Sequence, residues 1–176
     1  LKANMAPATN HRRIVVTPAD ALSEQQRRRD ERFMEMAIAA AEGGNGSPFG
    51  AVIVDHQTDQ VKCSGANRGG HNRLYHGEVD AIINCGNEHP EIDWTRLTLY
   101  TTGEPCPMCM SAIVWNRIPR VVYATSIRTL TDIGFPQLTL DSPTVAIAAP
   151  FYSGEIVSGV LAKRTDPMFK AWLASR

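Results

Sequence analysis

The chain has 176 residues, of which 43% are hydrophobic, and this is enough to build one domain with its own core. Its 18 Lys and Arg residues balance its 18 Asp and Glu residues, and no apolar run approaches the roughly 20 residues that span a bilayer. These features argue against a membrane protein. The missing basic excess argues against a nucleic-acid partner, because phosphate neutralisation dominates the affinity of such complexes.

The first segment differs from the rest of the chain. Residues 1–22 mix Asn, Pro, Ala, Thr and Arg without a period, which predicts a flexible, extended arm that packs poorly. Ser23 is expected to begin a helix, because Gln26 follows as its capping-box partner. A Gly-Gly pair at 43–44 is expected to end that helix.

Strands and helices alternate through the remainder of the chain. Apolar runs rich in β-branched residues predict strands at residues 48–55, 61–67, 97–102, 120–125 and 155–162. Further helices are predicted at residues 76–85, 107–118, 128–133, within 142–152 and at 167–174. Asp166 is the expected N-cap of the last helix. Because a hairpin is followed by βα units, residues 23–176 are predicted to form a single three-layer α/β/α domain around a mixed five-stranded sheet.

Two short motifs carry residues suited to catalysis. His76 and Glu78 lie in HGE, and Cys106 and Cys109 lie in PCPMC. One imidazole and two thiolates can hold Zn²⁺ at three corners of a tetrahedron and leave the fourth corner to water. A carboxylate two residues from the imidazole can sit beside that water and move its proton. The combination of H-x-E with P-C-x-x-C is typical of zinc-dependent nucleobase deaminases.

Other interpretations of these motifs stay open at this point. A C-x-x-C pair can be a redox pair or half of a structural zinc site, and a zinc-stabilised binding module would need no turnover. A redox pair would leave HGE unexplained, and a purely structural site needs no proton shuttle such as Glu78. The four cysteines, two of them used by the zinc motif, do not form a disulfide framework. We therefore expect a reducing, cytoplasmic compartment, where thiols stay available as ligands.

Over nearly its whole length the chain resembles the cytidine-deaminase-like superfamily, within the branch of guanine deaminases, fungal-type cytosine deaminases and bacterial tRNA adenosine deaminases. The resemblance is carried by the segments PFGAVIVD, GANR, HGEVDAI and TGEPCPMCMSAIVWNRIPRVVYA. It implies a five-stranded sheet flanked by helices and one zinc ion per chain, bound by His76, Cys106 and Cys109. It also implies a proton shuttle at Glu78 and, commonly, a homodimer.

The resemblance further implies a set of substrate-binding residues. Asn67 corresponds to an asparagine that hydrogen-bonds the substrate ring, although Asn before Arg-Gly-Gly is also ordinary turn chemistry. Gly77 would present its backbone N–H to the base, and Phe49 would pack against it. Trp115 corresponds to a tryptophan typical of guanine deaminases, although an interior helical Trp is more often part of the core.

Three substrate classes are compatible with the resemblance. Conversion of guanine to xanthine and ammonia is the first expectation, and the sequence IGF at 133–135 supports it. Two departures keep cytosine or a nucleoside open: PQL at 136–138 replaces the acidic residues usual after GF, and HGE resembles fungal-type cytosine deaminases. A tRNA adenosine substrate is the third possibility. Three acids are candidates for a further substrate contact: Asp132, Asp141 and Glu155.

Overall fold

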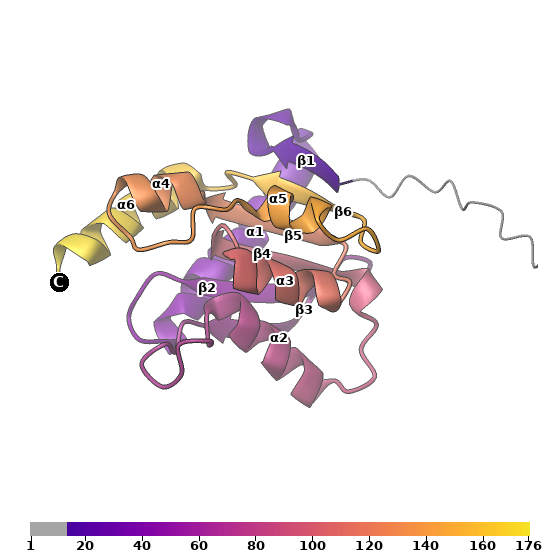
Figure 1. Ribbon diagram of the computed structural model, residues 1–176. Helices are drawn as coiled ribbons and strands as arrows, with labels where there is room; N and C mark the ends of the chain where they lie inside the picture. Colours follow the sequence, from indigo (N-terminus) through magenta and orange to yellow (C-terminus); the bar gives the residue numbers. More distant parts are fainter. Residues whose placement is uncertain (1–13) are drawn as a thin grey trace, which may run out of the picture.

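Within residues 14–176, six strands form one sheet in the order β1-β6-β5-β4-β2-β3. Their bounds are β1 Ile14–Pro18, β2 Gly50–Asp55, β3 Gln60–Ala66, β4 Leu97–Gly103, β5 Arg120–Thr125 and β6 Gly154–Ser158. β2 runs antiparallel to β3 and β4, whereas the pairs β4–β5, β5–β6 and β6–β1 are parallel. This computed structural model describes residues 14–176 (Figure 1). The mixed sheet and the α/β class agree with the prediction, but the sheet has one strand more than the five expected.

Helices cover both faces of the sheet (Figure 1). Their bounds are α1 Glu24–Ala40, α2 Gly77–Glu88, α3 Pro107–Trp115, α4 Ile127–Asp132, α5 Ser142–Ile147 and α6 Ala162–Ala174. Successive strand residues point to opposite faces, so Val52 and Val54 of β2 pack in one core cluster with α1. Ala51 and Ile53 pack in the other cluster with α2, α3 and α5. The predicted three layers are therefore present.

The sixth strand comes from the segment in which we expected an arm. Residues 1–13 of that segment lie outside the described residues. Ile14–Pro18 form β1 beside β6, and the Thr17 hydroxyl donates a hydrogen bond of 2.9 Å to Glu155. A short 3₁₀ turn follows at 19–21. The prediction of a flexible, poorly packed arm is therefore wrong for residues 14–22. This edge strand pairs with β6 through its main chain, and its neighbouring residues Val15 and Val16 are 46% and 48% exposed. The strand therefore does not show the alternation of buried apolar and exposed polar residues by which strands are predicted from sequence.

The predicted starts of the first and the last helix had different outcomes. The capping box is confirmed, because the Ser23 hydroxyl accepts a hydrogen bond from the Gln26 backbone N–H (3.2 Å) and the Gln26 side chain accepts one from the Ser23 N–H (3.1 Å). The N-cap assignment of Asp166 is wrong, because α6 already begins at Ala162. Asp166 lies inside α6, where its carboxylate accepts a hydrogen bond of 2.7 Å from the Thr125 hydroxyl and ties the helix to β5.

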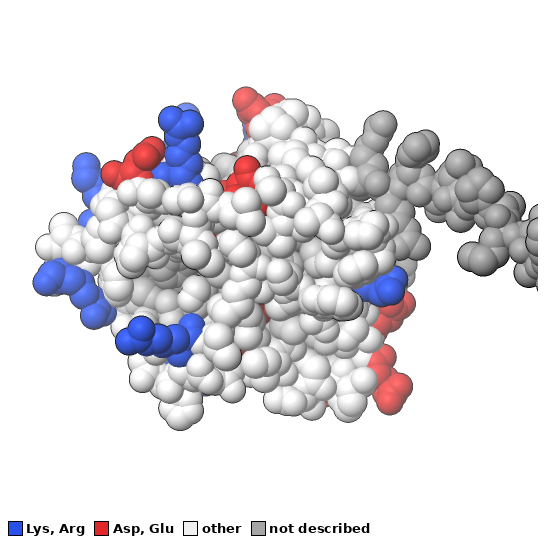
Figure 2. All heavy atoms as spheres, in the orientation of Figure 1, with Lys and Arg blue, Asp and Glu red and all other residues white. Residues whose placement is uncertain are grey.

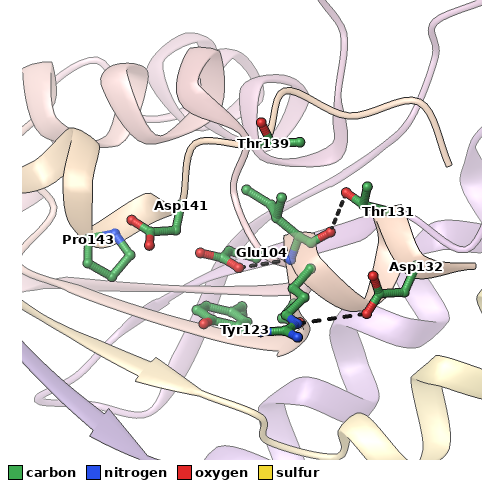
Figure 3. Close-up of a pocket in the computed structure, with 10 residues that line it drawn as sticks. Glu104, Tyr123, Thr131, Asp132, Thr139, Asp141 and Pro143 are labelled. Carbon is green, nitrogen blue, oxygen red and sulfur yellow. Dashed lines mark hydrogen bonds and ion pairs between the residues drawn. The ribbon is translucent and has the colours of Figure 1, made fainter. Parts of the chain in front are cut away.

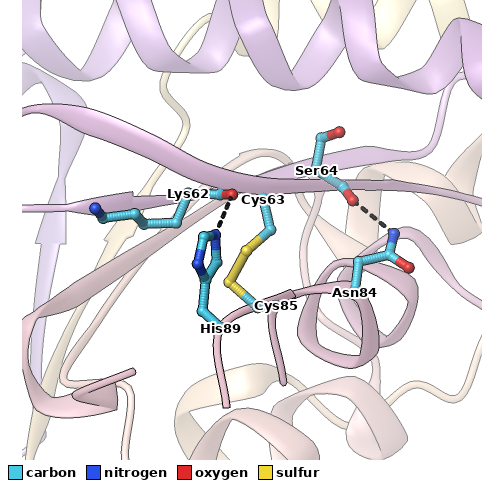
Figure 4. Close-up of a disulfide and its surroundings, with 6 residues drawn as sticks. All are labelled: Lys62, Cys63, Ser64, Asn84, Cys85 and His89. Carbon is cyan, nitrogen blue, oxygen red and sulfur yellow. Dashed lines mark hydrogen bonds between the residues drawn. A yellow bond between two sulfur atoms is a disulfide. The ribbon is translucent and has the colours of Figure 1, made fainter. Parts of the chain in front are cut away.

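The two cysteines outside the zinc motif form a disulfide, which the sequence did not lead us to expect. Cys63 in β3 and Cys85 in α2 are joined with their Cα atoms 5.3 Å apart (Figure 4). Strand and helix approach closely here because Gly65 has no side chain: a Cβ at this position would collide with the backbone of Gly77 and Ala81. Close packing of β3 against α2 therefore brings together two cysteines that are 22 residues apart.

A buried ion cluster fixes α1 to the sheet. The Arg120 guanidinium donates two hydrogen bonds to Asp30 (2.9 and 2.7 Å) and one to Glu155 (2.8 Å). The Tyr100 hydroxyl donates another to Asp30 (2.8 Å), whose exposure is only 1%.

Across residues 14–176, no helix has both the length and the apolar character that crossing a membrane requires.

Candidate metal centre and active site

The zinc motif residues lie at the first turns of two helices. His76 is the N-cap of α2, and Glu78 is in its first turn. Cys106 is the N-cap of α3, and Cys109 lies in its first turn behind a proline at the first helical position. The N-terminus of a helix carries partial positive charge, which favours thiolates and carboxylates nearby. The two helices therefore bring the four side chains to one place, where both N-termini favour negative charge.

The distances between the three proposed ligands fit a zinc ion. The Sγ atoms of Cys106 and Cys109 are 3.6 Å apart, and each lies 3.6 Å from Nδ1 of His76. Zinc bonds of about 2.3 Å to sulfur and about 2.0–2.1 Å to nitrogen place the ligand atoms of a tetrahedral site about 3.5–3.8 Å apart. The equilateral triangle therefore has the size of one face of a zinc tetrahedron, and its fourth corner is left to a non-protein ligand.

The acidity of the two thiols also fits a metal centre. The hydrogen bond from Cys109, followed by that from His76, lowers the pKa of Cys106 to about 4. The same hydrogen bond, with burial, raises the pKa of the Cys109 thiol well above its ordinary value. The pair alone therefore carries one thiolate. A divalent cation would supply the positive charge needed to deprotonate the second thiol, as metals do for coordinated sulfur.

Glu78 lies beside the ligands without being one of them. The group of donor atoms close enough to share a metal consists of His76, Cys106 and Cys109. Glu78 is only 4% exposed and accepts a hydrogen bond of 3.2 Å from the Thr101 hydroxyl. Burial raises the pKa of the Glu78 carboxyl, and the charge of the Cys106 thiolate raises it further. A raised carboxyl pKa is typical of groups that both take up and release protons near neutral pH.

A cavity of about 190 Å³ opens at His76. Its walls combine aromatic and amide side chains, and it is lined by Ser47, Phe49, Asn67, His76, Phe135, Pro136, Gln137 and Trp172. The predicted residues Phe49 and Asn67 are thus beside the metal centre. The Asn67 side-chain oxygen accepts a hydrogen bond of 2.8 Å from the Gly69 N–H, so the turn role considered for it is real. Its side-chain NH₂ group has no hydrogen bond to another residue within 14–176.

Gly77 is placed by close packing. A Cβ at this position would lie 3.3 Å from backbone atoms of Phe49 and Gly50, which is tighter than most side-chain contacts. Glycine therefore lets the first turn of α2 approach the start of β2. The backbone of Gly77 is thereby held next to Phe49, which lines the cavity at His76.

Trp115 does not lie in the cavity. Its side chain is 73% exposed at the end of α3 and packs on Phe151, with ring centroids 4.9 Å apart. The tryptophan that lines the cavity is Trp172 of α6, whose ring stacks on Phe135 at 5.4 Å and 11°. Its role as a wall, and that of Gln137, were missed, because nothing in the sequence places α6 next to residues 135–137.

None of the three candidate acids lines the cavity at His76. Asp132 and Asp141 line a separate, larger cavity of about 530 Å³ between α4 and α5 (Figure 3). Glu104, on the wall of that cavity, accepts hydrogen bonds from the backbone N–H groups of Ile127 and Ser142 (2.8 and 2.9 Å). Its carboxylate oxygens therefore hold the starts of α4 and α5 in place. Glu155 pairs with Arg120 in the buried ion cluster. The expectation of a substrate contact from one of these acids is not supported by their positions.

Comparison with known proteins identifies the family. The model of the cytidine and deoxycytidylate deaminase zinc-binding region matches residues 27–125. A guanine deaminase of Bacillus subtilis is 33% identical over 152 residues, covering 81% of this chain and 92% of that protein. A tRNA-specific adenosine deaminase of Rickettsia felis is 32% identical over 128 residues, covering 72% and 85%. The solved structure of guanine deaminase from Nitrosomonas europaea shares the fold, with a TM-score of 0.67 at 20% identity over 99% of this chain and 96% of that one. The chain therefore belongs to the cytidine and deoxycytidylate deaminase family and is a zinc-dependent hydrolytic deaminase.

Proposed function

We propose that the enzyme deaminates a free nucleobase or a similar small amino-heterocycle, with guanine as the preferred substrate and xanthine and ammonia as products. One observation carries the proposal: His76, which forms the ligand triangle with Cys106 and Cys109, also lines a cavity of about 190 Å³ that has aromatic walls. Flat aromatic walls stack well on a flat ring. The small volume suits a free base better than a base that carries a sugar and phosphate.

The protein groups divide the chemistry between them. Zinc held by the two thiolates and the imidazole supplies a Lewis acid that makes a water molecule nucleophilic near neutral pH. Glu78 takes a proton from the attacking water and delivers it to the ring nitrogen next to the amino-bearing carbon. Glu78 then takes up the proton of the hydroxyl added at that carbon and passes it to the amino group, so that a C=O forms, the C–N bond breaks and ammonia leaves. Thr101 keeps the carboxylate in position through its hydrogen bond of 3.2 Å.

Two amides in the cavity are compatible with a substrate that carries an oxo group. Gln137 and Asn67 line the cavity at His76, and no acidic residue is among the lining residues. A primary amide offers one acceptor and a donor side by side, so it pairs with a ring edge on which a C=O lies next to an N–H. A carboxylate offers acceptors alone and would favour an edge of N–H or amino groups. Guanine has an edge of the first type at its C6=O and N1–H and is therefore compatible with these amides; adenine can also pair with an amide, through its amino group and a neighbouring ring nitrogen, so the choice between the two bases depends on the substrate panel.

A panel of amines tests this assignment. Ammonia release from the zinc-loaded enzyme should be measured with guanine, adenine, cytosine, their nucleosides, amino-triazines and an adenosine-bearing tRNA anticodon stem-loop. We expect guanine to give the highest kcat/KM. Cytosine or cytidine as the best substrate would replace guanine in the proposal, and turnover of the stem-loop alone would overturn the free-base assignment.

We also propose that two copies of the chain associate through the face formed by α3 and α5. Figure 2 shows few charged side chains over these helices, in contrast to the edges of the same view. Trp115, Ile147 and Leu140 are 73%, 68% and 47% exposed, and Trp115 and Leu140 line a shallow cavity between α3 and α5. Exposed apolar patches of this kind usually mark protein interfaces.

Light scattering should give the mass of a dimer, and Trp115→Glu should shift it toward a monomer. The change Leu74→Glu, at another exposed apolar residue, is the control that should leave the mass unchanged.

A further inference from the structure

Among the described residues, a second group of possible metal ligands lies at the opposite end of α2 from His76. Donor atoms of Cys63, Glu88 and His89 all lie within 4.8 Å of one another. Cys85 adds a fourth donor, because its sulfur is bonded to that of Cys63 (Figure 4). Two sulfurs, one imidazole nitrogen and one carboxylate oxygen thus lie in one cluster where β3 meets the end of α2.

The local fold explains why these side chains meet. Glu88 is the last residue of α2 and His89 is its C-cap, whose backbone N–H donates to the Cys85 carbonyl, so both follow Cys85 closely, at three and four residues, at the end of the helix. Cys63 of β3 faces the same turn, since Gly65 lets the strand and the helix approach closely. Nε2 of His89 lies 3.3 Å from the backbone oxygen of Lys62, which keeps the ring beside the strand (Figure 4).

We propose that reduction of the Cys63–Cys85 disulfide converts this group into a second zinc site. The four ligands would be the two thiolates, the His89 imidazole and the Glu88 carboxylate, a donor set that suits tetrahedral zinc. The disulfide and the metal site exclude each other, because a sulfur in a disulfide cannot act as a thiolate ligand. The group is therefore a crosslink when oxidised and a metal site when reduced.

The chemical steps balance with a dithiol as the reductant. The dithiol transfers two electrons and two protons to the Cys63–Cys85 disulfide, so two protein thiols form and the dithiol itself becomes a disulfide. Zn²⁺ then binds the two sulfurs and both thiol protons are released to solvent. In a cell compartment where such dithiols keep thiols reduced, protein disulfides are rare and paired cysteines more often bind metals.

Exposure of the ligands gives the metal a route to the site. Cys63 and Cys85 are 5% and 0% exposed, whereas Glu88 and His89 are on the surface. A shallow cavity of about 300 Å³ is lined by residues that include Cys63 and Glu88, and a second of about 330 Å³ is lined by residues that include Lys62 and His89. A cation that meets the Glu88 carboxylate in the first cavity can therefore reach the Cys63 sulfur on the same wall, with a donor atom of His89 within 4.8 Å of both.

The proposed site is independent of the deaminase substrate and is tested by counting zinc. Full-length protein would be prepared oxidised, or reduced with a phosphine and supplied with zinc, and bound zinc would be measured by mass spectrometry after gel filtration. We expect one zinc per chain in the oxidised protein and two in the reduced protein. His89→Ala should lower the reduced value to one and leave the oxidised value unchanged. His56→Ala is the matched control, because His56 makes its hydrogen bonds through backbone atoms, and it should keep two.

A second measurement separates this site from the catalytic one and covers loss of fold. In a Cys106→Ala background, Co²⁺ added to the reduced protein should give thiolate-to-cobalt absorption, and that absorption should be lost when Cys63→Ser is added. Thermal unfolding of the reduced protein should shift to higher temperature on addition of zinc. Three results would overturn the proposal: one zinc in the reduced wild-type protein, two in reduced His89→Ala, or a reduced protein that stays unfolded with zinc present.

Discussion

The Thr101 hydroxyl lies 3.2 Å from a carboxylate oxygen of Glu78 and 3.0 Å from the backbone oxygen of Gly103. The single hydroxyl proton is shared between these two oxygens, so Thr101 ties the carboxyl of Glu78, which is 4% exposed, to β4. A buried carboxylate with a fixed partner occupies one position next to the metal ligands. This arrangement is suited to proton transfer at a defined atom of a bound ring.

Replacing Glu78 should separate metal binding from turnover. Glu78→Gln keeps the size of the side chain and can keep its contact with Thr101, but it cannot carry the transferred proton. We expect full zinc content and a fall in kcat of about 10²–10⁴-fold, the usual contribution of general acid–base catalysis. Zinc analysis and ammonia release measure the two quantities. A rate within tenfold of the wild-type rate would remove Glu78 from the proposed role.

Loss of one sulfur should remove the catalytic zinc. Cys106→Ala leaves two of the three protein ligands, and we expect both the zinc in this site and the activity to be lost. Ser111→Ala in the same helix is the control and should retain both, although it removes a hydrogen bond to the Pro107 carbonyl. Zinc should be counted in oxidised protein, so that only this site is occupied. Full occupancy in Cys106→Ala would take Cys106 out of the ligand set.

The stability of the metal-free enzyme should depend on pH through Glu78. Burial raises the pKa of Glu78 in the folded state above the ordinary value of 4.5. The folded state therefore binds this proton more tightly than the unfolded state, and stability falls as the pH rises through the window between the two values. Glu78→Gln removes this effect, so it should stabilise the metal-free protein at pH 8 and give no advantage below about pH 4, where glutamate is protonated in both states.

Urea unfolding in the presence of a chelator measures this difference. The exposed Glu91→Gln is the matched control and should give no gain at either pH. An advantage of Glu78→Gln that is as large at pH 4 as at pH 8 would contradict the burial of a charge as its cause.

Changing the amide at position 137 should alter substrate preference. Gln137→Glu keeps the shape of the side chain but replaces a donor by an acceptor, which leaves the oxo group of guanine without its partner. We expect the ratio of kcat/KM for guanine to that for 2-aminopurine, which lacks the oxo group, to fall about tenfold, or about 1.4 kcal/mol. Gln60→Glu, on an exposed position of β3, introduces the same charge and should leave the ratio unchanged. An unchanged ratio in Gln137→Glu would exclude Gln137 from recognition of this edge.

The buried ion cluster should be important for stability. Arg120→Met leaves Asp30 buried at 1% exposure without its cation, and loss of one partner of a buried pair costs about 3–5 kcal/mol. Arg128→Met is the control, because the Arg128 side chain is 91% exposed and its pair with Asp132 should contribute less than about 1 kcal/mol. Urea unfolding measures both. A loss below about 1 kcal/mol for Arg120→Met would show that Asp30 finds another partner or takes up a proton.

The metal centre could be predicted because it depends on short-range patterns. His76 with Glu78, and Cys106 with Cys109, are close in sequence, and each pair lies at the start of a helix whose beginning is also marked locally. Strand and helix positions were predicted for the same reason. The ligand triangle then needs one long-range relationship, the approach of α2 to α3, which the family resemblance supplied.

The features that were not predicted depend on packing between distant segments. Trp172 reaches the cavity because α6 packs beside residues 135–137, and Trp115 is excluded from it because α3 carries its last turn toward solvent. The Cys63–Cys85 disulfide depends on the approach of β3 to α2. β1 is held by backbone pairing with β6, which leaves little trace in side-chain composition.

The absence of a side chain at Gly65 restricts which substitutions the enzyme can accept. Any side chain at this position would act as a wedge against Gly77 and Ala81, the segment of α2 that also carries Glu78. A shift of that turn by about 1 Å is enough to cost on the order of 10²-fold in rate, because proton transfer depends on closely set distances. Substitution there would therefore impair catalysis at a distance from the reacting atoms.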